Sequence, residues 1–356
     1  IFCGGNFFIP ISSNYTKKPK KSEYCVAERI CSRPDARQGE GRNMPAQFTH
    51  RLLAEKALRA LPEDIRRKIG SLPAYYLGAQ GADILYFLHI RRGKEKNLGS
   101  YFHGVGVYEG FCSLLAASKE DGFAFSYAAG YITHYAADTM FHPFVYGMID
   151  KFNEYEPEWR GRRHSYIEND LDSYFVQKYR GVSVENYPFP RVERHVNVAK
   201  LYAIVARMCA DSRQRAFSER ALRAALDRFF RFGRFFTDEN LRRRRFFGGA
   251  ERTLHVPHLF SSMYRRPDYD ERCLNLSHAE WRNPSSPEYV SRESADDLFA
   301  RAEGECARLL KEFAVAAAED APLPREDFGN SMLTGVRAGI PLVRPRAGAK
   351  KTNTPH

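Results

Sequence analysis

Apolar residues recur along most of this chain with the three-and-four spacing of an α-helix. One such stripe lies between residues 50 and 61 and consists of His50, Leu53, Ala54, Ala57, Leu58 and Leu61. This spacing places apolar side chains on one face of a helix, and Thr49 stands where a helix N-cap is expected. The same period predicts further helices over residues 102–118, 122–141, 165–179, 195–210, 215–236 and 291–315.

The alternation of apolar and polar residues that is typical of β-strands does not extend over a useful length in this sequence. The best candidate for a membrane span, residues 123–137, contains His134 and stops at Asp138. It is shorter than the roughly 18 apolar residues that a bilayer span requires. We therefore expect an all-α protein with a multi-helix core, additional C-terminal helices and no transmembrane segment.

The two ends of the chain differ from this helical body. Residues 1–43 show no apolar period, and residues 335–356 are rich in Arg, Lys, Gly and Pro. We interpret Met44 as the natural start of the folded chain, residues 1–43 as a disordered or non-native leader, and residues 335–356 as a disordered basic tail. Between them we expect a helical core over residues 44–180 and a C-terminal helical part over residues 181–334 that packs on this core.

The formal net charge of +12 is concentrated in three segments. The leader holds eight basic against four acidic residues, and residues 334–356 hold five basic residues and no acidic one. The segment from Arg213 to Arg245 holds eleven arginines against four acidic residues. Because the rest of the body lacks excess positive charge, the charge is a weak indication of a nucleic-acid groove, and we do not expect a nucleic-acid partner.

Residues 213–247 interleave these arginines with phenylalanines, among them Phe229, Phe232 and Phe235. One interpretation is an amphipathic helix with its phenylalanines buried and its arginines in solvent. The other is a peripheral membrane contact in which the segment meets anionic lipid headgroups. The sequence leaves both interpretations open, and it leaves the oligomeric state open as well.

The seven cysteines are scattered and include no CxxC pair. In a chain of this length, such spacing indicates reduced thiols rather than a disulfide framework. The first residues also lack the order of a secretory signal, because the lysines between residues 17 and 21 follow the short apolar run instead of preceding it. We therefore expect a cytoplasmic location.

Two short motifs carry the candidate chemistry. In the first, His134, Asp138 and His142 follow one another at steps of four residues, which places them on one face of a helix. In the second, His164 and Glu168 have the same spacing. Imidazole nitrogen and carboxylate oxygen are ligands that Zn²⁺ accepts. Because the three-residue pattern is expected far less than once by chance, the two motifs together indicate a metal site.

With these motifs the chain resembles the zinc-dependent phospholipase C family, which includes clostridial alpha-toxin and bacterial phosphatidylcholine-hydrolysing enzymes. The similarity spans about residues 45–180, and its segments are Thr49 to Ala54, Leu77 to Leu85, His103, residues 134–142 and residues 164–168. The resemblance implies that residues 44–180 form an all-α, zinc-binding, phospholipase C-like core with up to three zinc ions.

The resemblance also implies which residues bind each metal. One zinc would be surrounded by Asp83, His103, His134 and Asp138, a second would be held by His142, His164 and Glu168, and a third by His50 with Asp138 as a bridge. Asp83 is in addition the implied general base. The secreted members complete the third site with an N-terminal Trp, whereas the first Trp of this chain is Trp159. We therefore expect two tightly held zinc ions and at most a weak third.

Each of these ligands has an alternative role without a metal. The paired residues can be hydrogen-bonded polar residues, His50 can be a core histidine, and Asp83 can cap a helix that begins at Ile84.

The four-residue step from Asp138 to His142 is shorter than the corresponding step in the secreted members. It is similar to the step in glycosylphosphatidylinositol-specific phospholipase D and in uncharacterised cytosolic members. Iron or manganese also stays open, because such sites bind several divalent ions.

Two metal ions about 3.5–4 Å apart can hold a phosphodiester and generate hydroxide near neutral pH. We therefore expect an enzyme, a zinc-dependent phosphodiester hydrolase of phospholipase C type in which activated water attacks a phospholipid-like substrate. One alternative is a single-strand-specific zinc nuclease, which has a similar ligand order but tends to have Asp where this chain has Glu168. The other is a non-catalytic zinc-binding helical module.

Overall fold

The computed structural model describes residues 46–88, 97–155, 164–238, 240–254 and 260–343. Within these ranges the chain is mostly helical, and its strands form one small hairpin. The predicted all-α class is therefore confirmed. None of the helices in these ranges is long and apolar enough to cross a membrane. The predicted leader lies outside the described residues.

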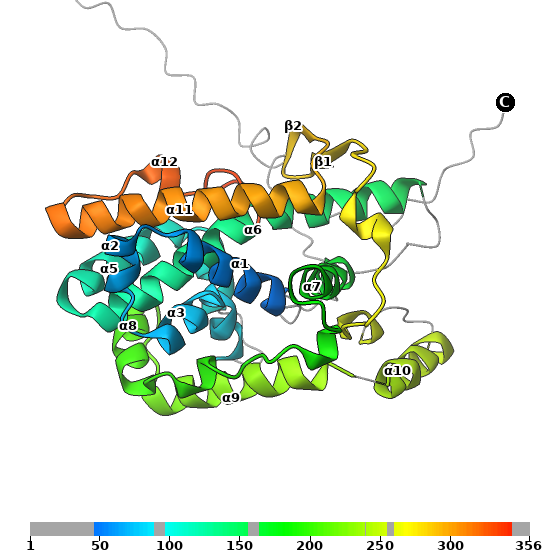
Figure 1. Cartoon of the computed structure of the whole chain (residues 1–356), viewed down its shortest axis with the longest axis horizontal. Helices are drawn as coiled ribbons and strands as arrows, with labels where there is room; N and C mark the ends of the chain where they lie inside the picture. Colours follow the sequence, from blue (N-terminus) through cyan, green and yellow to red (C-terminus); the bar gives the residue numbers. More distant parts are fainter. Residues whose placement is uncertain (1–45, 89–96, 156–163, 239, 255–259, 344–356) are drawn as a thin grey trace, which may run out of the picture. The chain divides into compact units, whose positions relative to one another are not determined.

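The longest helix, α6 (Gly122–Tyr155), contacts most of the elements around the interior. Figure 1 shows α11 (Ala295–Glu319) running alongside it, and α5 (Val107–Glu120) packs on it as well. The apolar run predicted to be a buried helix, residues 123–137, lies in the first half of α6 and is buried at every position but Phe123. This helix carries the first of the two candidate metal-binding motifs.

The short helix α3 (Leu72–Gly78) crosses α6 at very close range, and glycines permit this approach. A Cβ atom added at Gly130 would lie 1.8 Å from the backbone oxygen of Tyr75, and one added at Gly78 would lie 2.2 Å from that of Tyr127. These distances leave no room for any larger residue at either position. The crossing brings the 3₁₀ helix η1 (Gly81–Phe87), which follows α3 and contains Asp83, close to α6.

Helix α1 (Gln47–Ala60) packs against α7 (His164–Arg180), and its predicted apolar stripe is buried apart from the half-buried Leu58. The prediction that Thr49 is the N-cap is wrong, since the helix begins two residues earlier. The backbone amide and the hydroxyl of Thr49 instead donate to Asp172 Oδ1 on α7, each at 2.8 Å. The start of α1 is therefore held by a carboxylate of another helix.

The remaining elements are shorter or lie further along the chain. Around the interior they are α2 (Glu63–Lys68), the 3₁₀ helix η1 (Gly81–Phe87) and α4 (Leu98–His103). Further along the chain they are η3 (Val184–Asn186), η4 (Glu193–His195), α8 (Val198–Asp211), α9 (Glu219–Phe235), α10 (Arg242–Thr253), η5 (Ser261–Met263), η6 (Glu271–Leu274) and α12 (Arg325–Phe328).

The antiparallel hairpin of β1 (Trp281–Asn283) and β2 (Ser286–Ser291) was not predicted. Strands of three and six residues are too short for a clear alternating pattern. The hairpin packs on α6, where a Cβ atom at Gly147 would lie 2.4 Å from the backbone oxygen of Arg282. The ring of Trp281 is buried in this contact.

Several helix boundaries differ from the predicted ones. The predicted segment 102–118 is divided between α4 and α5 by a turn at Gly104–Gly106, and α6 continues through Pro143 to Tyr155. In the predicted basic tail, residues 335–343 are described and hydrogen-bonded to the body. The amide of Ser331 donates to Val336 O at 2.7 Å, and that of Ala338 donates to Gly329 O at 3.1 Å. Residues 344–356 lie outside the described ranges.

Candidate metal centre

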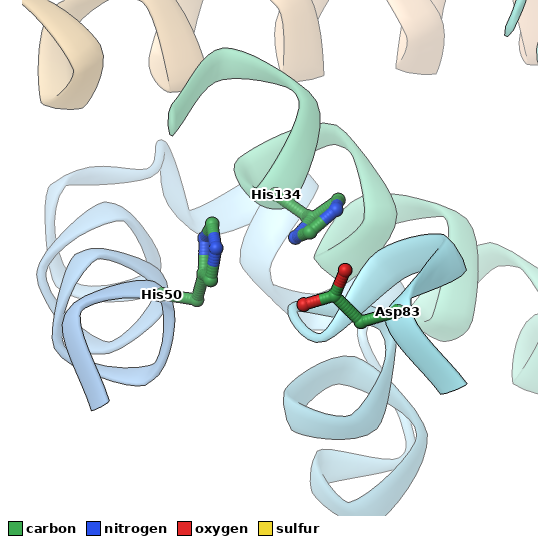
Figure 2. Close-up of side chains that lie close together, drawn as sticks. All are labelled: His50, Asp83 and His134. Atoms are coloured by element: carbon green, nitrogen blue, oxygen red, sulfur yellow. The ribbon is translucent and has the colours of Figure 1, made fainter. Parts of the chain in front are cut away.

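Five of the eight predicted ligands meet in the interior, although they come from four elements. His50 lies on α1, Asp83 on η1, His103 at the end of α4, and His134 and Asp138 on α6. All five are buried. Figure 2 shows three of them turned toward one another from α1, η1 and α6.

The donor atoms around Asp138 are spaced as the ligands of one metal ion would be. The Nε2 atoms of His103 and His134 are 3.2 Å apart, and they lie 3.4 and 3.1 Å from Asp138 Oδ2. Zinc bonds of about 2.0–2.1 Å in a tetrahedron place neighbouring ligand atoms about 3.3 Å apart. These three atoms are therefore spaced as one face of a tetrahedral zinc site would be.

Asp83 and His50 extend this cluster on two sides. Asp83 Oδ1 lies 3.1 Å from His103 Nε2, and His50 Nε2 lies 3.3 Å from Asp138 Oδ1. The donor atoms of His50, Asp83 and His134 also lie within 4.8 Å of one another. Asp138 thus presents one oxygen to His50 and the other to the pair of histidines, which is the arrangement that a bridging carboxylate requires.

Several buried polar atoms of the cluster lack a protein partner. Among the described residues, Asp138 Oδ2 accepts no well-oriented hydrogen bond, in spite of the nearby imidazoles, and the Nδ1 atoms of His50 and His134 have no partner. A buried polar atom without a partner is costly. A cation would satisfy the carboxylate oxygen, and a donor set of imidazole and carboxylate without thiolate suits hydrolytic zinc. The residues present therefore fit this metal.

Two backbone carbonyl groups fix the orientation of predicted ligands. His103 Nδ1 lies 2.8 Å from Gly99 O, and His142 Nδ1 lies 2.7 Å from Met332 O. Because a carbonyl oxygen only accepts hydrogen bonds, Nδ1 carries the proton in both rings. The lone pair of neutral imidazole is then on Nε2, the atom that faces the other ligands.

The other three predicted ligands form a second cluster next to the first. Glu168 lies between two histidines, with Oε1 3.4 Å from His142 Nε2 and Oε2 3.8 Å from His164 Nε2. His142 Nδ1 is also 3.7 Å from Asp138 Oδ2, so the two clusters are contiguous. The side chains of His142 and His164 are 14% and 21% exposed, whereas those of the first cluster are nearly inaccessible. This second cluster is therefore the accessible side of the centre.

The position of Asp83 depends on Gly81, which the sequence analysis did not single out. Gly81 has a positive φ of 50°, and a Cβ atom there would lie 1.9 Å from His134 Cδ2. Only glycine lets η1 approach the imidazole so closely. The 3₁₀ helix also begins at this residue, so Asp83 lies within its first turn and does not cap a helix at Ile84.

The electrostatic state of the centre is dominated by Asp138. Burial alone would raise its pKa, but His134, His142 and His50 around it lower the pKa well below its usual range. Burial also opposes protonation of His142, yet Asp138 and Glu168 raise its pKa to about 9. Burial lowers the pKa of His134. The cluster thus combines an ionised carboxylate with imidazoles of different basicity.

Some residues that support the centre could not have been found from motifs. Met332, beyond α12, provides the carbonyl for His142, and its own amide donates to His103 O at 2.8 Å. Arg265 donates from Nε to Asp172 Oδ2 at 2.8 Å, and Asp172 holds the start of the helix that carries His50. No sequence motif marks a backbone carbonyl group that orients a ligand. A single Arg or Asp is also only a weak indication of such a supporting role.

Comparison with known proteins identifies one matching family. A family model described as zinc dependent phospholipase C matches residues 49–230. This range contains all eight predicted ligands but neither Arg265 nor Met332. No curated protein and no solved structure matches the chain.

Proposed function

The chain belongs to the zinc-dependent phospholipase C family, and from this premise we propose that it hydrolyses a phospholipid-like phosphodiester at its two contiguous His/carboxylate clusters. The observation that carries the proposal is the spacing of the donor atoms of His103, His134 and Asp138, which suits one tetrahedral metal ion. Buried imidazoles in a purely structural role would pair with separate partners instead of converging on one carboxylate oxygen.

Zinc is the metal that this donor set favours. His103, His134, Asp138 and Asp83 would hold one ion, and His142, His164 and Glu168 a second. His50 with Asp138 would contribute to a weak third site. Bound zinc supplies Lewis acidity, which withdraws electron density from a phosphoryl oxygen and lowers the pKa of water.

The side chains of the protein have distinct roles in this proposal. The phosphate group of the substrate enters from the accessible side, beside His142 and His164. Asp83, which contacts His103 but lies at the edge of the first cluster, accepts a proton from the attacking water at its carboxylate. Asp138 holds the imidazoles of both clusters in place and keeps its negative charge, because its pKa is far below neutral.

The decisive experiment measures zinc content and hydrolysis on the same protein. The metal-replete chain, residues 1–356, is assayed with bis-p-nitrophenyl phosphate, phosphatidylcholine micelles and single-stranded DNA. We expect about two zinc ions per chain and hydrolysis of the first two substrates. A zinc content below one, or full zinc without hydrolysis of any phosphodiester, would contradict the proposal. Cleavage of the DNA alone would favour the nuclease alternative.

Two matched substitutions separate catalysis from metal binding. Asp83→Asn should retain most of the zinc while hydrolysis falls by about 10²–10⁴-fold, the usual effect of removing a positioned general base. Asp138→Asn should release zinc and lower the melting temperature, because it removes the charge that both clusters share. Asp227→Asn, at an exposed position on α9, is the control and should change neither. Full activity in Asp83→Asn would refute the base assignment but leave the metal site intact.

We also propose the cytoplasmic location that the cysteine pattern favours. Cys209, Cys273 and Cys306 are buried free thiols, and Cys112 is exposed and free. Such thiols suit a reducing compartment. Fractionation of cells that produce the chain, with thiol titration of the purified protein, tests this location. Secretion or a disulfide at Cys112 would contradict it.

A further inference from the structure

Helix α10 is less buried than the other long helices, since its residues are exposed or half-buried at all but one position. Between Arg242 and Thr253, Glu251 alone is buried. Phe247 is half-buried against a small apolar cluster next to the helix, whereas its neighbour Phe246 is left uncovered by the described residues. Phe246 on this helix and Leu254 directly after it are each 70% exposed. Two large apolar residues at this exposure within one short helical segment indicate a surface that meets a partner.

The aromatic rings on and beside α10 form one continuous patch. The ring of Phe247 lies 5.5 Å from that of Phe246, 5.7 Å from that of Phe260 and 6.5 Å from that of Phe235. Phe260 and Phe235 are themselves exposed. We name this patch, together with Leu254 and the arginines of α10, the α10 surface.

Among the described residues, the α10 surface exposes arginines, whereas its two acidic side chains are turned inward. Arg242, Arg245 and Arg252 are exposed. The Glu251 carboxylate accepts hydrogen bonds from the amides of Phe260 and Ser261, and Asp238 accepts the amide of Arg243 at 2.7 Å. Both acids are thus engaged with the backbone.

The combination of exposed apolar rings and arginines fits the interface of an anionic bilayer. Arg242 lies one helical turn before Phe246, so that the two share a face, and Arg243 stacks on Phe235 at 5.0 Å. An interfacial helix buries apolar side chains at the level of the acyl boundary and pairs its basic residues with lipid headgroups. Single-stranded nucleic acid would use the aromatic rings and arginines but gives no role to the aliphatic Leu254. Charge and hydrophobicity therefore favour lipid.

The α10 surface is connected directly to the accessible side of the metal centre. Glu251 and Phe260 lead into η5, where Ser262 O accepts a hydrogen bond from Asn169 Nδ2 at 2.9 Å. The Oγ atoms of Ser262 and Ser165 are 3.4 Å apart. Asn169 and Ser165 each directly follow a predicted ligand on α7, Glu168 and His164.

We propose that the α10 surface docks the protein on anionic phospholipid membranes, with Phe246 and Leu254 inserted at the interface and the arginines of α10 on the headgroups. This membrane contact places the side of the metal centre that carries His164 near the lipid. The membrane binding itself is independent of catalysis. The use of that orientation to reach a lipid substrate rests on the proposed function.

The test is cosedimentation of the full-length chain with vesicles. Wild-type protein is mixed with vesicles of phosphatidylcholine alone and with vesicles that also contain phosphatidylserine, at low and high salt. We expect binding to the anionic vesicles that weakens as salt rises, since exposed charges are screened. The double variant Phe246→Ser/Leu254→Ser and the double variant Arg242→Ser/Arg245→Ser should each bind at least ten-fold more weakly.

Matched controls distinguish this surface from the rest of the chain. Val315→Ser, an exposed apolar residue on α11, and Arg220→Ser, an exposed arginine on α9, should bind as wild type does. All variants keep both ends of the chain, so a difference between them reports on the α10 surface. Because Phe246 and Leu254 are largely in solvent, the melting temperature of the double variant Phe246→Ser/Leu254→Ser should equal that of wild type. Unchanged vesicle binding by both double variants would overturn the proposal. Binding of single-stranded DNA is measured in parallel, and double variants that lose DNA binding but keep vesicle binding would overturn it as well.

A catalytic variant separates this proposal from the proposed function. Asp83→Asn should bind vesicles as wild type does even when hydrolysis is lost. The double variant Phe246→Ser/Leu254→Ser should keep hydrolysis of bis-p-nitrophenyl phosphate and lose it on vesicle lipid. Vesicle binding without hydrolysis of any substrate would refute the enzyme and leave the docking surface. Hydrolysis of vesicle lipid that does not depend on these residues would refute the docking surface and leave the enzyme.

Discussion

At the scale of single residues, the histidines of the centre differ in the partners of their two ring nitrogens. His103 and His142 each donate Nδ1–H to a carbonyl, from Gly99 and Met332, and direct Nε2 to the carboxylates. His134 is buried with its Nδ1 unpaired among the described residues. The histidines that resemble one another in the sequence therefore differ in basicity and in how firmly they are oriented.

The raised pKa of His142 predicts a pH dependence of both stability and zinc binding. In the metal-free protein this pKa is about 9, above the ordinary value near 6.5. The stabilisation from its protonated form is therefore complete below about pH 6.5 and is lost as the pH rises through about 9. Zinc must displace this proton, so the increase in melting temperature on adding zinc should be larger at pH 9 than at pH 6.

Melting curves at several pH values, with chelator or with zinc, test this prediction. His142→Gln is the control, because it cannot hold the proton and should show a smaller pH dependence of the zinc effect. An equal zinc effect at pH 6 and pH 9 in wild-type protein would contradict the assignment of the raised pKa to His142.

At the scale of elements, the close crossing of α3 and α6 brings η1, which carries Asp83, to the histidines of α6. Gly130→Ala would place a Cβ atom 1.8 Å from Tyr75 O, so the helices must separate. We expect a loss of about 1–3 kcal/mol in the free energy of unfolding, as for other overpacked sites. Chemical denaturation measures this loss, and zinc content should fall with it.

Gly304→Ala on α11 is the matched control for this substitution. No atom lies within 4 Å of a Cβ at that position, and it is inside a helix. Alanine there should stabilise the protein by about 0.5–1 kcal/mol, since it restricts the unfolded chain. Equal stability of Gly130→Ala and Gly304→Ala would contradict the close approach of α3 to α6.

The junction of α1 and α7 gives a second prediction at this scale. Asp172 accepts the amide and hydroxyl of Thr49 and pairs with the buried Arg265. Asp172→Asn leaves the arginine without a counter-charge and should cost about 3–5 kcal/mol. Glu120→Gln, which removes an exposed pair with Arg207, should cost less than about 1 kcal/mol. Equal losses of stability in the two variants would show that the buried network does not hold α1.

At the scale of the whole molecule, the candidate centre is contacted by chain beyond the family domain. The matched range ends at residue 230, yet Met332 contacts both His103 and His142. A chain that ends at Val343 should keep its zinc content and melting temperature, whereas one that ends at Asn330 should bind zinc more weakly. Zinc titration of the two truncated chains measures the difference. Equal affinity for zinc would mean that the carbonyl of Met332 is dispensable.

Zinc binding should also stabilise the whole protein, since a metal that binds only the folded state shifts the unfolding equilibrium. At 100 times its dissociation constant, zinc would add about 2.7 kcal/mol. Addition of a chelator should therefore lower the melting temperature by several degrees, and zinc should restore it. A melting temperature that does not respond to zinc would contradict a metal centre in the interior.

The sequence by itself determined the helices and the pairs of candidate ligands within one helix. A helix depends on neighbours in the chain, so steps of four residues already place His134 beside Asp138 and His164 beside Glu168. The link from these motifs to zinc came from the resemblance to a family. Assignment of the individual zinc ligands stays a prediction.

Only the tertiary structure decided which residues from different helices meet and what supports them. The contact of His50 with Asp138 requires that α1 be held on α7, and the position of Asp83 requires a glycine at residue 81. The carbonyl that orients His142 belongs to Met332, 190 residues away. Every residue has such a carbonyl, so no sequence pattern distinguishes the one that packing brings to the imidazole.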